Sequence, residues 1–406
     1  MKKKILVVSL GYPTKENPFE CTFFKEQIDF LSSEYEFTIV VCKEERRGFL
    51  FDRKPTISTL EYTKGIKQYY PVIYVSAFRK CIEAVGAVIC KKKRAQLTVG
   101  IYRSDAYRQY RRKCISNIIR DNNLDYDLVY CISAQGIAYD ALLFSELKSK
   151  PLIVSEHRPY PHPGWSTIDA EKEAIEKAEC FLAIGKDKIR QIMLQNIRPK
   201  RIAYTGNLID ETKFIISPEK HEYPTLLIVA AHAYFKNFDM FVETINKLVD
   251  KTDKEFRVII AGYGANKGYA TDTELLEQKI KNSKFPEKAE LIREVSRDDI
   301  CRLYNRSDAF VLTSIQEGQP MVALEAACSG LPIFSTRCGG VEDYIDDEIG
   351  RIVDITDSEA LSEYLCDFIE GNIAFDGVRI RNRVIEKYGR EAFMQVMKNE
   401  FDRILY

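Results

Sequence analysis

The stretch 309–330, AFVLTSIQEGQPMVALEAACSG, decides the fold of this chain. Its apolar run 309–312 has the length and composition of a buried strand, and the apolar segment 321–329 is helix-like. A strand that turns through a glycine-containing loop into a helix is the repeating unit of a parallel α/β sheet. The free N–H groups of such a helix point back towards the strand end, so the loop predicts a site for phosphate or another anion.

Short apolar runs alternate with longer amphipathic runs on both sides of this stretch. The strand-like runs are 5–10, 38–42, 128–132, 152–156, 180–184, 225–231, 257–261, 289–292 and 332–335. The helix-like runs are 23–33, 106–122, 139–148, 170–178, 239–250, 272–282 and 297–306. This alternation predicts parallel sheets covered by helices on both faces.

The chain has 406 residues, and a single core rarely grows past about 250–300 residues. We therefore expect an α/β protein with two Rossmann-like domains facing a central cleft. The polar, proline-bounded segment 217–224 indicates the seam. The expected domains are 1–215 and 216–385, and we expect a last helix, 386–406, to pack back on the first domain.

Composition excludes several classes of protein. The 60 Lys and Arg balance 60 Asp and Glu, so a uniformly basic nucleic-acid-binding protein is excluded. The eleven Cys include no C-x-x-C pair, which is typical of reduced thiols in a cytoplasmic protein. No uncharged run reaches the roughly 18 residues of a membrane-spanning helix. The apolar run near the start is short and lacks a small-residue cleavage site, so we expect a cytoplasmic protein.

Two carboxylates flank the start of the helix at 321. Glu317 lies in the loop and Glu325 lies one turn into the helix, so both can accept hydrogen bonds from paired sugar hydroxyls. Alternatively, Glu325 is a buried residue near the positive end of the helix. The spacing alone does not decide between these interpretations.

Several motifs together resemble a known family. Glu317-Gly318-x-Pro320 with Glu325-Ala326, 330–333 and 339–340 is similar to the E-x7-E signature of retaining, nucleotide-sugar-dependent glycosyltransferases of the GT-B fold, family 4. The segments 18–27, 155–157, 207–214, 260–264 and 307–309 resemble further family motifs in the family's order. The resemblance is strong in 225–345 and loose in 45–120.

The resemblance implies roles for particular residues. Glu317 would hold hydroxyls of the transferred sugar, and Glu325 would hold the ribose of the nucleotide. Glu317, Lys236 and His157 are the expected catalytic residues. The other expected donor contacts are Gly318, Gln319, Pro320, Met321, Val322, His232, Gly262 and Gly264, and the expected acceptor contacts are Gly11, Tyr12 and His162. The donor is a substrate, so no cofactor is expected.

No metal site is expected either. Asp125 and Asp127 have the D-x-D spacing of metal-dependent sugar transferases, but they precede a strand, so we interpret them as strand-entry residues. The glycines at 262, 264 and 268 have the wrong spacing for a dinucleotide-binding fingerprint.

Three positions depart from the family pattern. Lys236 matches the family's phosphate-binding lysine, but Ala231 occupies the position of its arginine, which removes a bidentate phosphate clamp. Gln319 replaces a common aromatic residue, and Cys21 replaces an early glycine. Two alternatives therefore stay open: a nucleotide-sugar epimerase on the same fold, and a non-catalytic protein that binds a glycan or a partner.

The segment 79–120 is strongly basic. It contains twelve Lys and Arg against Glu83 and Asp105, with apolar stretches between them. Such a segment suits the surface of an anionic membrane, and it also suits a solvated helix face. We expect a retaining, metal-independent hexosyltransferase that acts on a glycan or lipid-linked glycan in bacterial-type polysaccharide, capsule or lipopolysaccharide synthesis. It would use UDP- or GDP-sugar, be cytoplasmic or peripheral on the inner membrane face, and bind no nucleic acid.

Overall fold

The structure is a computed structural model that describes residues 2–17, 20–45, 50–79, 81, 105–157, 169–217, 222–264 and 270–406. The expected acceptor residue His162 and the basic positions 80, 91–94 and 103 lie outside these residues. Contacts within the chain divide it into two compact units. Unit 1 is Met1–Thr205 with Met394–Tyr406, and unit 2 is Gly206–Phe393. Within the described ranges, no helix is both long and apolar enough to cross a membrane.

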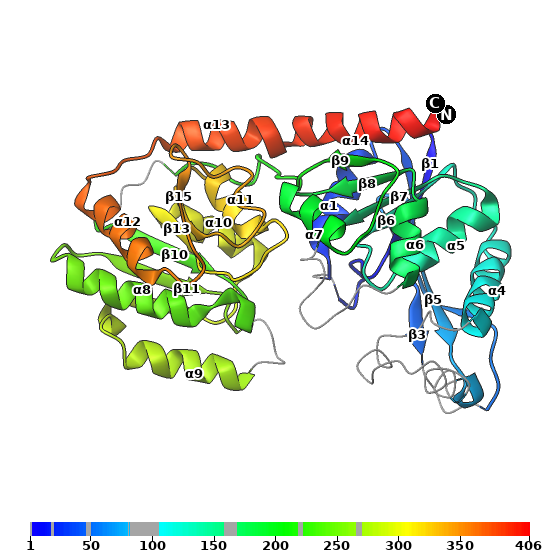
Figure 1. Cartoon of the computed structure of the whole chain (residues 1–406), viewed down its shortest axis with the longest axis horizontal. Helices are drawn as coiled ribbons and strands as arrows, with labels where there is room; N and C mark the ends of the chain where they lie inside the picture. The colour runs from blue at the N-terminus through cyan, green and yellow to red at the C-terminus, as the bar shows by residue number, and fades with distance from the viewer. Residues whose placement is uncertain are drawn as a thin grey trace. The chain divides into compact units, whose positions relative to one another are not determined.

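Unit 1 contains one mixed sheet (Figure 1). Its order in the described residues is β3 (Lys43–Glu45), β5 (Ile66–Tyr74), β2 (Glu36–Val40), β1 (Lys4–Ser9), β6 (Leu128–Ile132), β7 (Leu152–Glu156), β8 (Cys180–Ala183) and β9 (Ile202–Tyr204). These strands pair in parallel, and β4 (Thr56–Thr63) pairs antiparallel with β5.

The helices of unit 1 follow its parallel strands. They are α1 (Thr22–Leu31), α4 (Asp105–Asp121), α5 (Ala138–Lys148), α6 (Asp169–Lys177) and α7 (Lys186–Leu194). Helices α4, α5 and α6 lie side by side (Figure 1). The last helix, α14 (Arg390–Leu405), carries Phe401, whose ring packs on Tyr35 and Tyr130 of unit 1.

Unit 2 contains a fully parallel sheet in its described part. The order is β12 (Ala289–Ile292), β11 (Arg257–Ala261), β10 (Thr225–Val229), β13 (Ala309–Leu312), β14 (Ile333–Thr336) and β15 (Gly350–Val353). From β10 the chain runs outward to β12, and it then returns to β13 on the other side of β10. Strands β10 and β13 therefore flank the topological switch point, where ligands of such sheets bind.

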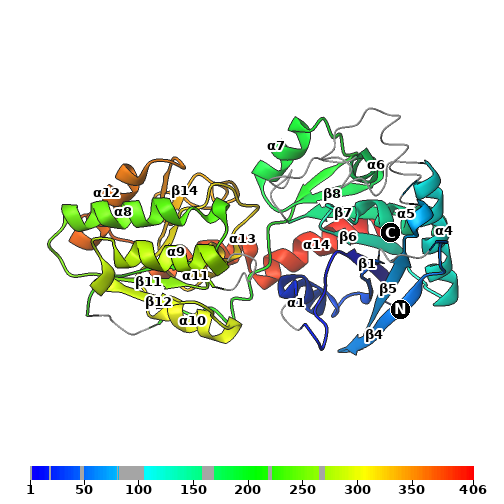
Figure 2. The same ribbon diagram turned by 90° about the horizontal axis from the view of Figure 1, so that it is seen from below.

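The helical elements of unit 2 are η1 (Tyr234–Lys236), α8 (Phe238–Lys251), α9 (Ala270–Lys281), η3 (Pro286–Lys288), α10 (Arg297–Asn305), α11 (Met321–Cys328), α12 (Ser358–Glu370) and α13 (Gly377–Tyr388). Helices α8 and α12 lie side by side in Figure 1 and Figure 2. Side-chain caps set four of the helix starts. Asn237, Ser296, Asp357 and Asp376 accept N–H bonds in the first turns of α8, α10, α12 and α13.

The division between the units differs from the expected boundary at 215/216. The segment that follows Thr205 groups with unit 2 because it packs on α13, where Ile209 N–H donates to the Tyr388 carbonyl at 2.9 Å. Arg381 of α13 donates to the backbone carbonyls of Glu211 and Phe214. Residues Met394–Tyr406, rather than all of 386–406, group with unit 1.

Candidate functional site

The two loops at the switch point of unit 2 are joined to one another. One follows β10 and carries Lys236, and the other follows β13 and carries Glu317. The N–H of Ile315 donates to the carbonyl of Phe235 at 2.7 Å, and the N–H of Glu317 donates to the carbonyl of Cys338 at 2.7 Å. These backbone hydrogen bonds therefore fix the positions of the Cα atoms of Lys236 and Glu317.

Lys236 and Glu317 form an ion pair. Lys236 Nζ lies 2.5 Å from Glu317 Oε1, and the two side chains are 18% and 10% exposed. Ser314, which is fully buried, donates from its Oγ to the same carboxylate oxygen at 2.7 Å. The structure thus brings together two of the three expected catalytic residues, together with a hydroxyl that the sequence analysis did not identify.

The N-terminus of α11 lies directly after this pair in the chain. The first hydrogen bonds within α11 run from the N–H groups of Ala323 and Leu324 to the carbonyl of Pro320, so the N–H groups of Met321 and Val322 precede them. A helix start carries a partial positive charge and free donors. Next to a lysine, these N–H groups suit an anionic ligand.

Gly340 lies tightly against the loop before α11. Its φ is +74°, and a Cβ at this position would come within 2.2 Å of the carbonyl oxygen of Gly318. Only glycine fits this combination of conformation and contact. Gly340 therefore fixes the path of the loop that contains Glu317.

Glu325 is fully buried. Tyr304 of α10 donates to Glu325 Oε2 at 3.0 Å, and the Tyr304 hydroxyl also lies 3.0 Å from the carbonyl of Val322. The second glutamate of the motif therefore lies beneath the helix surface, held by a tyrosine that we did not predict. Its role as a ribose contact stays a prediction.

Gln319 uses its side chain within unit 2. Its Oε1 accepts from the N–H of Asn207 at 2.7 Å, and Asn207 Nδ2 donates to the Gln319 carbonyl at 3.3 Å. Both residues are buried. In place of the family's common aromatic residue, Gln319 ties the loop before α11 to the segment that begins at Gly206.

The remaining expected donor residues in unit 2 surround the end of β11. Gly262 has φ +79° and donates to Ile292, and Gly264 donates to Arg293, both at 2.8 Å. His232 stacks on Phe238 with ring centroids 5.3 Å apart. With residues of α8 and α9, His232 lines a hollow of about 250 Å³. Ala231 is exposed.

The described acceptor candidates belong to unit 1. Tyr12 is 1% exposed, and burial raises the pKa of its hydroxyl, so its ring is part of the core of unit 1. Gly11 accepts a hydrogen bond from Ser9 at 2.7 Å. His157 lies at the end of β7, where its Nε2 is 3.3 Å from Ser155 Oγ and its ring packs on Phe24.

The D-x-D pair forms a strand-entry contact. Asp127 Oδ2 accepts from the backbone N–H of Lys4 at 3.0 Å, and the Lys4 ammonium lies 2.8 Å from Asp125. Among the described residues, no group of three or more His, Cys, Asp or Glu is arranged to hold a metal ion.

The basic segment 79–120 is described only in part. Five of its described cations form ion pairs with acidic side chains: Arg79 with Asp52, Arg108 with Glu173, Arg111 with Asp140, Arg112 with Glu146, and Arg120 with Asp121. The pair of Arg111 with Asp140 is buried, with side chains 3% and 0% exposed. The four of these arginines that lie on α4 contribute to the fold of unit 1, and the contact of this segment with a membrane stays a prediction.

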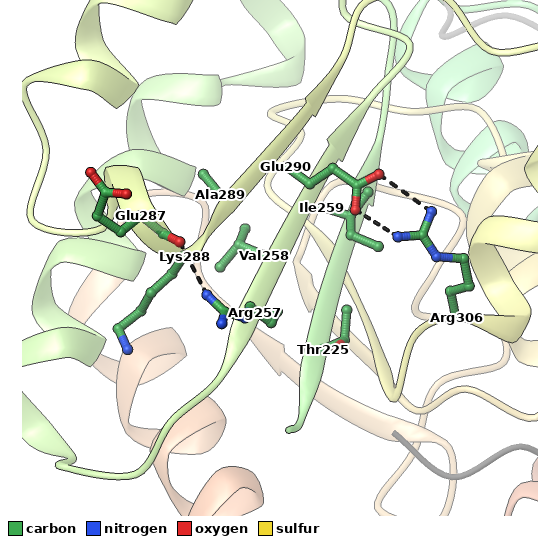
Figure 3. A pocket seen from close by; sticks show the side chains of 9 residues that line it. All are labelled: Thr225, Arg257, Val258, Ile259, Glu287, Lys288, Ala289, Glu290 and Arg306. Carbon is green, nitrogen blue, oxygen red and sulfur yellow. Dashed lines mark hydrogen bonds and ion pairs between the residues drawn. The ribbon is translucent and has the colours of Figure 1, made fainter. Parts of the chain in front are cut away.

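A larger hollow of about 420 Å³ lies at the opposite edge of the unit 2 sheet (Figure 3). It is lined by Thr225, Arg257 and Ala289, which begin β10, β11 and β12. Glu290 pairs with Arg306 across it at 2.7 Å. This hollow lies at the strand starts, whereas Lys236 and Glu317 follow the strand ends.

A family model matches this chain over unit 2, and several curated proteins match a part of it. The family model described as glycosyl transferases group 1 matches residues 209–391, which include Lys236, Glu317 and Glu325. The chain is 33% identical over 263 residues to the amylovoran biosynthesis glycosyltransferase AmsD of Erwinia amylovora, covering 59% of this chain and 67% of that protein.

More distant relatives match a smaller part of their own length. The gpi3 subunit of the phosphatidylinositol N-acetylglucosaminyltransferase of Schizosaccharomyces pombe is 24% identical over 44% of this chain and 38% of that protein. The chain thus spans less than half the length of this relative. The O-antigen chain mannosyltransferase RfbU of Salmonella typhimurium is 26% identical over 46% of this chain and 52% of that protein.

Solved structures share the GT-B fold over nearly the whole chain. The lipopolysaccharide outer core galactosyltransferase WaaB has a TM-score of 0.69 at 18% identity, covering 98% of this chain and 99% of that chain. The Anabaena protein HepE, solved in complex with UDP and glucose, has a TM-score of 0.67 at 13% identity, covering 99% of this chain and 100% of that chain.

Proposed function

This chain belongs to the group 1 glycosyltransferases, and we propose that it moves a sugar from a UDP- or GDP-sugar to a glycan or lipid-linked glycan acceptor. The observation that carries the proposal is the Lys236–Glu317 pair beside the N-terminus of α11, within the region that the family model matches. The ligand of this site must join a diphosphate to a sugar if each group is to have a partner. The cation and the helix start suit the diphosphate, and the carboxylate suits the sugar hydroxyls.

Each group has a distinct task in this proposal. The N–H groups at the start of α11 hold the diphosphate, and the Lys236 ammonium neutralises the charge that develops on it as the sugar departs. Glu317 accepts hydrogen bonds from hydroxyls of the sugar. Because Ala231 supplies no cation, Lys236 and the helix start carry this neutralisation.

We further propose that the reaction retains the anomeric configuration. The acceptor hydroxyl attacks from the face that the diphosphate leaves, and its proton passes to the departing phosphate oxygen. The bond from the anomeric carbon to the phosphate breaks with its electron pair on the phosphate, and the bond to the acceptor oxygen forms. This step needs neither a covalent intermediate nor a metal ion.

The names of the relatives refer to amylovoran biosynthesis, to the O-antigen chain and to phosphatidylinositol. We therefore propose an acceptor from bacterial-type polysaccharide, capsule or lipopolysaccharide synthesis, reached at the inner face of the membrane. His157 and the loop that contains Gly11 are proposed to contact this acceptor.

A thermal-shift screen against UDP- and GDP-sugars tests the donor, because a ligand that binds the folded state raises the melting temperature by an amount that grows with the logarithm of its concentration over its Kd. A shift with one donor that is lost in Lys236→Ala supports the proposal. No shift with any donor would instead favour a non-catalytic binding protein, and conversion of the donor without acceptor would favour an epimerase.

A further inference from the structure

Four hydroxyl side chains lie at the ends of β13 and β14, and none of them is exposed to solvent: Thr313, Ser314, Ser335 and Thr336. A buried hydroxyl without a partner is costly, so the partner of each one reveals its role. Thr313, Ser314 and Thr336 bond to the two loops of the site, whereas Ser335 donates to the carbonyl of its neighbour Thr336 at 2.8 Å.

Thr313 and Ser314 close a ring with the ion pair. Thr313 Oγ1 donates to the backbone carbonyl of Lys236 at 3.1 Å, and Lys236 Nζ donates to Glu317 Oε1 at 2.5 Å. Ser314 Oγ donates to the same Oε1 at 2.7 Å, and the peptide bond between Thr313 and Ser314 completes the ring. Thr336 Oγ1 donates to the Ser314 carbonyl at 2.5 Å and so fixes the ring on the sheet.

The two oxygens of Glu317 are therefore unequal. Oε1 accepts from both Lys236 and Ser314, whereas Oε2 accepts no hydrogen bond from the described part of the chain. Ser314 determines which oxygen is held by the protein and which remains for a ligand.

We propose that Ser314 is a positioning residue that holds Glu317 in place while the Lys236 ammonium turns from the carboxylate to the donor's diphosphate. This inference rests on the proposed function and deepens it. When Lys236 shifts, Glu317 loses one of its two hydrogen-bond donors, and the Ser314 hydroxyl is the one that stays. Oε2 then remains directed at a sugar hydroxyl, so Ser314 acts on the sugar through Glu317 and makes no contact with the nucleotide.

The test compares the affinity for a nucleotide sugar with the affinity for its free nucleoside diphosphate. UDP-glucose, UDP, GDP-mannose and GDP are each titrated calorimetrically into four proteins: the parent chain, Ser314→Ala, Ser314→Thr and Ser335→Ala. UDP-glucose is compared with UDP, and GDP-mannose is compared with GDP. Ser335 is the matched control because it is equally buried on the neighbouring strand and donates its hydrogen bond to the carbonyl of Thr336 rather than to Glu317. Ser314→Cys, close in size to serine but a weak donor, replaces Ser314→Ala if the latter does not fold.

For the pair that the parent binds, Ser314→Ala should bind the free diphosphate as the parent does and lose about tenfold in affinity for the nucleotide sugar. Its kcat should fall by a similar factor, and Ser314→Thr should restore both values. Ser335→Ala should leave both affinities unchanged. Equal losses for the sugar and the free diphosphate, or a Ser314→Ala variant indistinguishable from Ser335→Ala, would overturn the inference. A parent chain that binds neither pair would overturn the proposed function itself.

Discussion

Replacement of Glu317 by glutamine should tighten the binding of a free nucleoside diphosphate while it nearly abolishes sugar transfer. In the free chain, Glu317 competes with the diphosphate for the Lys236 ammonium at a distance of 2.5 Å. A hydrogen bond between charged groups contributes roughly 1.5–3 kcal/mol, and one to a neutral amide contributes roughly half as much. The substitution thus removes about 0.75–1.5 kcal/mol of competition, which corresponds to about 4- to 13-fold tighter binding.

Isothermal titration calorimetry with UDP and with GDP measures this effect. Glu290→Gln is the matched control because it removes the same charge from unit 2, where Glu290 pairs with Arg306 at the far edge of the sheet (Figure 3). The control should change the affinity by less than about twofold, since exposed ion pairs act weakly at a distance. Unchanged or weaker diphosphate binding by Glu317→Gln would refute the idea that Glu317 holds Lys236 back from its ligand.

Three further outcomes follow from the packing. Gly340→Ala should abolish donor binding, because its Cβ would strike the backbone of the loop before α11. Gly371 has a similar φ but open space around it, so Gly371→Ala should cost only about 1 kcal/mol of stability. Equal effects of the two substitutions on donor binding and on chemical denaturation would contradict this. Tyr304→Phe removes the hydroxyl that donates to Glu325 Oε2, so it should lower the unfolding free energy by about 1–3 kcal/mol and weaken the binding of UDP or GDP. An unchanged affinity for both nucleotides would contradict the assignment of Glu325 to the nucleotide site. Burial lowers the pKa of Lys188 to about 8, below its unfolded value, so the unfolded chain binds more protons between about pH 8 and 10.5. Between pH 7.5 and pH 10, the unfolding free energy of the parent should therefore rise by up to about 3 kcal/mol relative to that of Lys188→Met. If the unfolding free energies of the two proteins instead changed in parallel with pH, the lowered pKa of a buried Lys188 would be contradicted.

The parts of the fold that the sequence predicts well are the strands buried on both faces. The expected runs 128–132 and 152–156 coincide with β6 and β7, because every residue of these strands is buried. The hairpin of β4 and β5 was not predicted. Strand β4 alternates partly buried and exposed residues and includes Thr and Glu, so it lacks a continuous apolar run. Strand β15 was missed for a similar reason, since it contains Gly350 and Arg351.

The site was predicted where the sequence carries a motif, and missed where a partner comes from elsewhere in the chain. The resemblance identified Lys236 and Glu317, which the structure brings together. Tyr304 lies 21 residues before Glu325 on a different helix, and only the packing of α10 on α11 makes them partners. Ser314 lies three residues before Glu317 at a strand end, but the loop geometry decides that its hydroxyl turns to the carboxylate.

The most direct measurement is acceptor-dependent release of UDP or GDP from the nucleotide sugar that the chain binds, with lipid-linked glycans as acceptors. The parent should release the diphosphate only when an acceptor is present. Glu317→Ala and Lys236→Ala should each lower the rate by about two orders of magnitude or more while the chain remains folded, which circular dichroism measures. Release at the parent rate by both variants would contradict the assignment of this site to glycosyl transfer.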